Sequence, residues 1–530
     1  GAGAMATALL RAARRPGTLA AAAGGAALAA YAAPRLSLNP LGAAWDDSPS
    51  PMQALASALR VGRCAAAAAV IVADYRASGP EGLEAAHARS GERLRRVCEA
   101  NGGIYIKLGQ HVALLDYLVP EPYLRALQPL FDRAPRSTAR EARRVIAADL
   151  GMAVEEAFDR FEDEPIASAS LAQVHRAWLP GGRAVAVKVQ HPGLRESAGA
   201  EVAALAALVA LVRLALPELG FQWLVDEVRH NLPLELDFRA EAANAARCTA
   251  GLAPRFGGRV VVPQSHAELS GPRVLTMDFE SGMPLGDPAA LRAAGLSPAS
   301  VARLLSRVFG HMTFASGFVH CDPHPGNLLV TRDGRLALID FGLCAEVPRP
   351  DTARLTAAIV HTMEGDVARL VDDAVLLGFL PPDVDRAALA PLLGRALKAG
   401  ADQAVRDFEE GRAGGYAAVG RRRRHFHDVS NELNAIFFRF PFAVPDYFSL
   451  ITRSLIVLEG IALSGDPGFD ILDAAFPWVA AHAVRMVRDG EVHAGDVLAG
   501  ASALHAAASP ERAARALAER LEATTGHRVD

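Results

Sequence analysis

The sequence is short of the residues that build disulfide frameworks, structural zinc sites and nucleic-acid-binding surfaces. Its 530 residues include only five cysteines, which are scattered and show no Cys-x-x-Cys spacing. This argues against both a disulfide scaffold and a structural zinc site. The net charge of −4 gives no bulk electrostatic case for nucleic acid as a partner. The one dense basic run, from Arg421 to Arg424, is more typical of a solvated surface than of a binding patch.

Acidic side chains are missing from the first 45 residues. The first carboxylate of the chain is Asp46, whereas Arg11, Arg14 and Arg15 would share one face of a helix. An acid-free, arginine-bearing and alanine-rich segment is typical of an organelle transit peptide. We therefore predict a transit peptide or flexible N-terminus over 1–45 that directs the chain to the mitochondrion, with the chloroplast as the alternative.

Outside this N-terminal segment, every long apolar run in the sequence is interrupted by a charged residue. Within the segment, the Ala/Gly stretch from Thr18 to Ala33 is weakly apolar and shorter than the roughly 20 residues that a membrane-spanning helix needs. The body of the protein is accordingly expected to be soluble, or peripheral to the inner membrane.

The hydrophobic content of 51% is enough to bury a sizeable core in two or three lobes. Residues from 46 to about 160 have a helical composition. The next 30 residues contain two strand-like runs separated by Pro180, Gly181 and Gly182, a pattern that predicts a hairpin. Further short strands, a helix over about 298–316 and a mostly helical remainder follow. The predicted fold class is α+β, with a small strand-containing lobe before a helix-rich large lobe.

The stretch "VHCDPHPGNLLVTRDGRLALIDFG", residues 319–342, raises the question of a metal site or a phosphoryl-transfer site. Asp333-Gly334 is a strong hairpin-turn signal. Asn327 and Asp340 are equidistant from that turn, so cross-strand pairing predicts that their side chains are neighbours. Carboxylate and carboxamide oxygens are ligands that Mg²⁺ prefers. Asp322 precedes them on a loop stiffened by two prolines.

Phosphoryl transfer is the better interpretation of this stretch. Asp-x₄-Asn followed by Asp-Phe-Gly is the catalytic-loop and magnesium-loop arrangement of kinases, with Asp322 as base or substrate-orienting group and Asn327 and Asp340 as metal ligands. A zinc site needs more imidazole than His320 and His324 supply. His320 is predicted to be a buried scaffold residue instead. From this stretch alone, an ordinary hairpin with surface acids stays possible.

Upstream residues supply the other parts that a phosphoryl-transfer site needs. Lys188 lies in the strand-like run "AVAVKVQ", on the face opposite its valine neighbours. The run "LELDFRAEAA" places Glu235, Asp237 and Glu241 on one predicted helix just after Pro233. Six residues separate Glu235 from Glu241, so their carboxylates would point in different directions and could serve two cations.

A glycine-rich phosphate flap is absent, since no glycine occurs from Met152 to Pro180. The run "ASASLAQVH", residues 167–175, stands in its place. Alanine and serine restrict positive φ, so a phosphate-covering loop here would differ in shape and stiffness.

Together with "IYIKLGQ" upstream, these motifs resemble the UbiB family of atypical kinase-like proteins, also called aarF-domain-containing kinases. The resemblance covers residues 100 to about 350 and is greatest to the mitochondrial aarF subgroup. It implies a protein-kinase-like two-lobe fold with a family-specific N-terminal helical extension. The implied organisation is an extension over 46–155, a kinase-like domain over 156–480 with lobes at 156–281 and 282–480, and a helical tail over 481–530.

The resemblance also implies roles for individual residues. Asp322, Lys188 and Glu241 would be catalytic, with Lys188 paired to Glu241, while Asn327 and Asp340 would bind Mg²⁺. Lys107 and Gln110 would belong to a regulatory segment that covers the active site, with Lys107 facing Glu235 and Asp237. The implied ATP or ADP contacts are Ala167, Ser168, Ala169, Ser170, Lys188, Met277, Asp278 and Glu280. The sequence departs from the common family pattern at Ser168 and Ala172, which bears on nucleotide preference.

Two functions follow as hypotheses. The first is a Mg²⁺-dependent ATPase or small-molecule or lipid-linked kinase that acts in mitochondrial lipid or quinone homeostasis. The second is a non-catalytic, ATP-sensing scaffold for membrane or lipid partners. The five residues that the chemistry needs are all present, which favours the enzyme: Lys188, Glu241, Asp322, Asn327 and Asp340. A conventional Ser/Thr protein kinase is disfavoured, because the glycine flap is missing and no Ala-Pro-Glu follows the Asp-Phe-Gly at 340–342.

Overall fold

A computed structural model describes most of the chain. The described residues are 51–78, 82–113, 119–131, 136–215, 222–398, 440, 442, 445–465, 471–490, 514–515, 517–519 and 522. The predicted transit peptide and the basic run at 421–424 lie outside them. The chain divides into two compact units, the first ending at Ala242 but also including Ser265–Phe279, and the second comprising Ala243–Gln264 and the residues from Glu280 onward.

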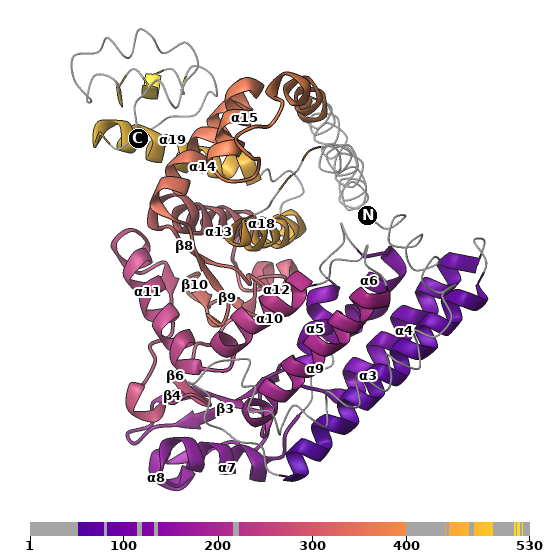
Figure 1. The fold of residues 1–530 in the computed structure, drawn as a ribbon. Helices are drawn as coiled ribbons and strands as arrows, with labels where there is room; N and C mark the ends of the chain where they lie inside the picture. The colour runs from indigo at the N-terminus through magenta and orange to yellow at the C-terminus, as the bar shows by residue number, and fades with distance from the viewer. Residues whose placement is uncertain are drawn as a thin grey trace. The chain divides into compact units, whose positions relative to one another are not determined.

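The first unit is built from a helical layer and a small antiparallel sheet. Its helices are α3 (Pro51–Ala77), α4 (Leu83–Asn101), α5 (Ile104–Val112), α6 (Glu121–Leu127), α7 (Ala139–Leu150), α8 (Val154–Ala157), α9 (Leu194–Ala215), α10 (Gln222–Glu235) and the start of α11 (Phe238–Phe256). Helices α3, α4 and α9 run side by side (Figure 1). An ion pair between Arg60 of α3 and the buried Glu201 of α9 fixes this packing.

Helix α3 has a largely apolar outer face. Leu55, Leu59 and Val70 are 61%, 57% and 50% exposed. Residues Leu55–Tyr75 are long and apolar enough to cross a membrane, with a mean hydropathy of 1.6 and 11% of the residues buried. Core helices of soluble proteins and signal sequences share these properties, so length and composition alone assign no membrane span.

The sheet of the first unit has the strand order β1-β3-β4-β6, with β2 also paired to β3. Its strands are β1 (Arg160–Phe161), β2 (Ala167–Ser168), β3 (Ala172–Trp178), β4 (Ala184–Gln190) and β6 (Val274–Asp278), and every pairing is antiparallel. The β3–β4 pair confirms the predicted hairpin around Pro180. Val185, Val187 and Val189 of β4 are fully buried against α7 and β6, as strand alternation predicts.

The prediction that Glu235, Asp237 and Glu241 lie on one helix is wrong. Glu235 is the last residue of α10, and Pro233 lies inside that helix rather than before it. Asp237 sits between the helices, where its side chain accepts a hydrogen bond from the backbone N–H of Arg239 at 3.1 Å. This local bond competes with continued helix and starts α11 instead, so Glu241 lies in the first turn of a new helix.

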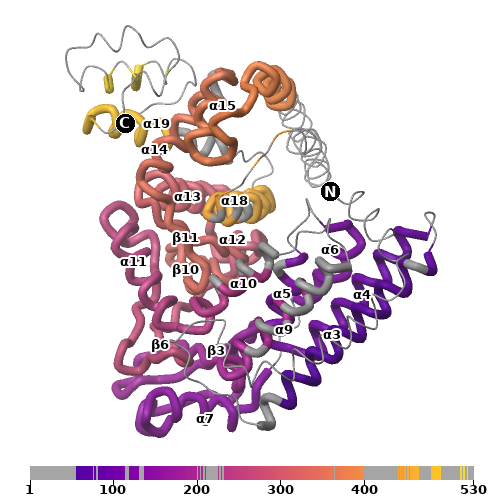
Figure 2. Tube along the Cα trace, in the orientation of Figure 1, coloured from indigo at the N-terminus to yellow at the C-terminus, as the bar shows by residue number. Residues whose placement is uncertain are grey.

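The second unit combines short strands with a helical body. A four-stranded sheet has the order β5-β10-β9-β7, and a separate pair joins β11 to β8. The strands are β5 (Val260–Val261), β7 (Met283–Pro284), β8 (Phe318–His320), β9 (Leu328–Val330), β10 (Leu336–Leu338) and β11 (Cys344–Glu346). The helices, besides the rest of α11, are α12 (Pro288–Ala293), α13 (Pro298–His311), α14 (Arg349–Glu364), α15 (Val367–Leu376), α18 (Asp446–Gly465) and α19 (Ile471–Arg488). Figure 2 shows α13 and α18 packed together within this unit.

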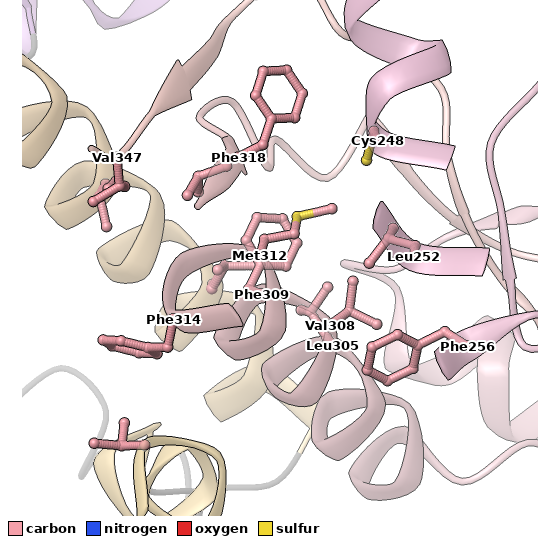
Figure 3. Close-up of a cluster of buried hydrophobic side chains, with 14 of the residues drawn as sticks. Cys248, Leu252, Phe256, Leu305, Val308, Phe309, Met312, Phe314, Phe318 and Val347 are labelled. Atoms are coloured by element: carbon pink, nitrogen blue, oxygen red, sulfur yellow. The ribbon is translucent and has the colours of Figure 1, made fainter. Parts of the chain in front are cut away.

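Helix α13 is the centre of the second unit's core. It begins at a Ser297 cap, and a π-helical turn over Met312–Ser316 follows it, in agreement with the helix predicted over about 298–316. Its buried face carries Leu305, Val308 and Phe309, which pack toward side chains of α11 (Figure 3). This core supports β8, β9 and β10, the strands that flank the residues of the 319–342 stretch. The mixed helical and sheet architecture confirms the predicted α+β class.

Candidate functional site

Lys188 and Glu241 form a buried ion pair in the first unit. The Lys188 Nζ atom lies 2.7 and 2.8 Å from the two carboxylate oxygens of Glu241, and the side chains are only 12% and 5% exposed. The Phe238 ring lies 5.3 Å from the ammonium group and further limits its contact with water. The pairing inferred from the sequence is confirmed. It holds the lysine on β4 in one orientation against the Glu241 carboxylate.

The alanine- and serine-containing run forms a tight hairpin without glycine. Residues Ala167–Ser168 are β2, and the Ala169 N–H donates to the Ala172 carbonyl at 2.7 Å to close the turn toward β3. No described non-glycine residue has a positive φ, so the turn is unstrained. Ser170 is buried.

His191 anchors this hairpin from outside. Its Nε2–H donates to the Ala169 carbonyl at 3.1 Å, and its Nδ1 lies 2.8 Å from the Ser137 hydroxyl. Burial lowers the pKa of His191, which favours the neutral ring that this pair of bonds requires. His191 directly follows β4 in "KVQHP", but no motif in the sequence points to its role.

The predicted nucleotide contacts at the end of β6 differ in their surroundings. Met277 is buried, whereas the Asp278 carboxylate accepts hydrogen bonds from Arg183 at 2.6 Å and from His266 at 3.0 Å. The Asp278 side chain is therefore already engaged. Glu280 follows two residues later in the chain.

Residues Lys107–Gln110, here called the KxGQ segment, lie on α5, and the structure supports only part of the expected pairing. Lys107 Nζ is 3.3 Å from Glu235 Oε2, which confirms that pair. The expected contact of Lys107 with Asp237 is wrong, because Arg239 occupies the Asp237 carboxylate through bonds of 2.6 and 2.9 Å. Gln110 turns away from these acids and donates from Nε2 to the Leu130 carbonyl at 2.9 Å.

In the second unit, β9 and β10 form the predicted hairpin, but the predicted register is wrong by one residue. Leu338 pairs with Leu328, and the Ile339 N–H donates to the Asn327 carbonyl at 3.1 Å. Asn327 is thus opposite Ile339 rather than Asp340. The physical reason is a three-residue turn over 332–334, in which Gly334 adopts a φ of +82°.

His320 connects Asp322 and Asp340 through their backbones. It is 1% exposed, its Nε2 donates to the Asp340 carbonyl, and its Nδ1 accepts from the Asp322 N–H at 3.3 Å. Burial lowers the pKa of His320, which favours the neutral form. Both ring nitrogens are occupied, so His320 is a scaffold residue, as predicted, and does not serve as a zinc ligand.

Asn327 is oriented by Asp322. Its Nδ2 group donates to the Asp322 carbonyl at 3.1 Å and approaches Asp322 Oδ2 at 3.4 Å. An amide that donates on this side presents its carbonyl oxygen on the other side. Asp340 uses Oδ1 to accept the Gly342 N–H at 2.9 Å. An amide oxygen and a carboxylate are the hard oxygen donors that suit Mg²⁺, so the residues present fit the ion.

Asn244 is a supporting residue that the sequence motifs do not identify. Its Nδ2 donates to the Phe341 carbonyl at 3.0 Å and so fixes the backbone of the Asp-Phe-Gly segment. A signal existed, because Asn244 is the one amide in the alanine-rich run "AEAANAA" and follows Glu241 by three residues, on a neighbouring position of the same helix face.

A strand lysine paired to a helix glutamate, with Asp-x₄-Asn and Asp-Phe-Gly on a hairpin, defines an atypical kinase-like protein. Residues 129–374 match the family model described as the ABC1 atypical kinase-like domain. The chain is 43% identical to AarF domain-containing protein kinase 1 of Gallus gallus over 320 residues, covering 57% of this chain and 61% of that protein. The chain belongs to this UbiB, or aarF-domain, family and is similar to its kinase 1 subgroup.

Other relatives extend the comparison. The mouse (Mus musculus) AarF domain-containing protein kinase 1 is 42% identical over 327 residues, covering 58% of this chain and 62% of that protein. Protein ACTIVITY OF BC1 COMPLEX KINASE 3, chloroplastic, of Arabidopsis thaliana is 34% identical, covering 76% and 54%. The chain thus spans less than two thirds of the length of each of these relatives. A solved Rv3197–erythromycin complex from Mycobacterium tuberculosis is 25% identical, with a TM-score of 0.46 over 68% of this chain and 87% of that one.

Proposed function

We propose that the protein binds adenine nucleotide with Mg²⁺ and turns it over, as an ATPase or as a kinase of a small or lipid-linked molecule. The observation that carries the proposal is the buried Lys188–Glu241 pair, whose bonds of 2.7 and 2.8 Å hold a cation in a fixed position on a strand. A lysine held in this way is the kinase device for binding nucleotide phosphates.

The residues of the 319–342 stretch take the remaining roles in this proposal. Asn327 and Asp340 would hold Mg²⁺, and Asp322 would orient or deprotonate the hydroxyl that receives the phosphoryl group. Bound Mg²⁺ would neutralise charge on the nucleotide phosphates. Asp322 is placed by its own contacts with Asn327 and His320, which limit its freedom. A non-catalytic ATP-sensing scaffold needs no such oriented acid in addition to metal ligands, so the enzyme is favoured.

The proposed setting is mitochondrial lipid or quinone homeostasis. Similarity to the kinase 1 subgroup and the acid-free segment before Asp46 support the compartment. The exposed apolar side chains of α3, Leu55, Leu59 and Val70, support association with a membrane surface or an isoprenoid lipid. The chloroplast is the alternative compartment.

The test is nucleotide-dependent stabilisation and turnover by the full chain. Mg²⁺ with ATP is expected to raise the melting temperature, because a ligand that binds only the native state stabilises it. Asp340→Asn should remove most of the Mg²⁺-dependent part. Asp333→Asn is the matched control, since Asp333 is an exposed carboxylate in the turn of the same hairpin. An equal shift in the wild-type and Asp340→Asn proteins would remove the metal assignment.

Turnover separates the enzyme from the scaffold. We expect measurable hydrolysis or transfer of the γ-phosphate, with a higher rate in the presence of lipid vesicles, and loss of that rate in Asp322→Asn. Nucleotide binding with no turnover, with or without vesicles, would instead assign the protein to the ATP-sensing scaffolds.

A further inference from the structure

A separate pocket lies within the first unit, beyond the C-terminal end of β4. Its cavity volume is about 210 Å³, and its walls come from one face of α7, the end of β4, the first turn of α9 and the start of β6. None of the residues assigned to nucleotide, Mg²⁺ or the KxGQ segment lines it. Typical sites for drug-sized ligands measure about 300–1,000 Å³, so the pocket suits a smaller molecule.

Three guanidinium groups line this pocket, from Arg144, Arg195 and Arg273. Arg144 is exposed on α7 and makes no hydrogen bond or ion pair with any residue that the structure describes. The Arg273 guanidinium has only long contacts, 3.4 Å to Glu196 and 3.4 Å to Asp149. Guanidinium groups suit planar, charge-assisted recognition of phosphate and carboxylate, so the pocket favours an anion.

The acidic residues of the pocket are committed elsewhere. Glu141 Oε2 accepts bonds from the backbone N–H and the hydroxyl of Thr138 at 2.8 and 2.7 Å, which forms the capping box of α7. These bonds lower the pKa of Glu141, so it remains an ionised cap. Glu196 lies in the first turn of α9 and faces Arg273. The pocket is thus lined by three guanidinium groups and by two carboxylates that already have partners.

A buried acceptor provides an independent indication of a ligand. Gln190 is 2% exposed, and its Nε2 donates to the carbonyls of Leu236 at 2.8 Å and Pro272 at 3.3 Å. These two bonds fix the amide orientation, and its buried Oε1 has no hydrogen-bond partner among the described residues. Buried acceptors are rarely left unpaired, so a ligand in this pocket that carries a donor would satisfy Oε1.

The first turn of α9 also favours an anion in this pocket. This 22-residue helix begins at Leu194, directly after Gly193, which also lines the pocket. The first N–H groups of a helix have no partners within it and attract negative charge. The arginines and the first turn of α9 therefore favour an anion, and Gln190 Oε1 in the same pocket favours a ligand that also carries a hydrogen-bond donor.

We propose that this pocket binds a small phosphate or phosphomonoester, an anion that retains at least one hydroxyl hydrogen. The anionic oxygens meet Arg144, Arg195 and Arg273, and a P–OH or neighbouring alcohol donates to Gln190 Oε1. Sulfate has the same shape and charge but no proton near neutral pH, so it lacks the donor. The site is independent of the proposed nucleotide binding.

The experiment is calorimetric titration of the full chain with inorganic phosphate at pH 7, in the absence of nucleotide and Mg²⁺. Arg144→Gln is expected to weaken phosphate binding about tenfold or more, because it removes a charge-assisted contact. Arg140→Gln is the matched control. Arg140 is an exposed arginine of the same helix that does not line the pocket, so its replacement should leave the affinity unchanged. Sulfate should bind several-fold more weakly than phosphate.

Two further titrations identify the source of the phosphate group. Glycerol 3-phosphate represents a free ester, and vesicles containing phosphatidic acid present the same group on a lipid surface. Arg144-dependent binding of either probe supports the site and assigns its source. Equal phosphate affinity in the wild-type and Arg144→Gln proteins, or no binding of any probe at millimolar concentration, would overturn the proposal. Loss of nucleotide binding in Asp340→Asn would not affect either result.

Discussion

At the scale of single residues, burial decides which ion pairs contribute to stability. Lys188 and Glu241 are 12% and 5% exposed, whereas Arg239 and Asp237 are 64% and 26% exposed. An exposed pair is screened by water and contributes about 0–1 kcal/mol. A buried pair is more sensitive to loss of one partner, because the remaining charge keeps its desolvation cost.

Lys188→Met is therefore expected to lower the free energy of unfolding by about 3 kcal/mol, since Glu241 would stay buried without a counter-ion. The double variant Lys188→Met with Glu241→Met should recover much of that loss. Urea denaturation followed by circular dichroism measures both. Arg239→Ala, which removes an exposed cation from the helix that carries Glu241, should lower the free energy of unfolding by about 1 kcal/mol or less. Strictly additive losses in the double variant would show that the two side chains do not interact.

The Lys107–Glu235 contact allows a second comparison of this kind. Lys107 is 30% exposed and Glu235 is 10% exposed, at an N···O distance of 3.3 Å. Because the lysine is partly solvated, Lys107→Ala should lower the free energy of unfolding by only about 1 kcal/mol. A double-mutant cycle with Glu235→Gln measures the coupling. A coupling energy of zero would leave Lys107 without a role in holding α5 to α10.

At the scale of elements, turns and caps decide where functional residues lie. Asp237 lies between two helices, so Glu235 belongs to α10 and Glu241 belongs to α11. Likewise, the turn over 332–334 shifts the β9–β10 register by one residue and places Asn327 opposite Ile339. The helix break and the register change both arise from local hydrogen bonds. The Arg239 N–H donates to the Asp237 carboxylate, and the Gly334 N–H donates to the Thr331 carbonyl.

Gly334→Ala tests the turn of this hairpin. Gly334 has a φ of +82°, and an added Cβ would meet Leu296 Cδ2 at 3.4 Å, which is an ordinary contact. The expected loss of about 1–2 kcal/mol in the free energy of unfolding thus comes from the left-handed backbone rather than from a clash. Thermal denaturation compared with Arg332→Ala, in the same turn, measures it. A Gly334→Ala protein as stable as that control would mean that the turn adopts another conformation.

At the scale of the whole molecule, several buried and half-buried histidines are neutral for the same reason. Burial is the largest cause of a lowered pKa in each member of a set of six: His87, His175, His191, His311, His320 and His482. The pKa of His482 falls to about 4. In the unfolded chain each would titrate near its ordinary value of 6.5.

The stability of the protein should consequently fall as the pH decreases below about 6.5. In that range the unfolded chain binds protons that the native protein does not bind, and each such histidine contributes up to about 1.4 kcal/mol per pH unit. The loss continues until the pH reaches the lowered native pKa values. Urea denaturation at pH 7.5, 6.0 and 5.0 measures it. His175→Gln, which removes a fully buried ring, should reduce the slope; an unfolding free energy that is constant from pH 7.5 to 5.0 would contradict the expectation.

The residue types of the candidate site could be predicted from short motifs. Lys188, Asp322, Asn327 and Asp340 were recognisable because each lies in a short motif whose residue types and spacing are tied to a strand, loop or turn. The β3–β4 hairpin, the burial of alternate valines on β4 and the scaffold role of His320 followed from local patterns, and the structure agrees with them. Local patterns are reliable where neighbouring residues in the chain set the conformation.

The partners of these residues, in contrast, depend on how distant segments pack. Lys107 pairs with Glu235 but not with Asp237, because another cation, Arg239, occupies the Asp237 carboxylate. Asn244 and His191 support the site from other elements, and no spacing in the sequence shows that His191 would meet Ala169. The pocket beyond β4 joins arginines that are far apart in the chain, from Arg144 to Arg273. Such contacts depend on how helices and sheets pack, which is a property of the folded chain and not of any one segment.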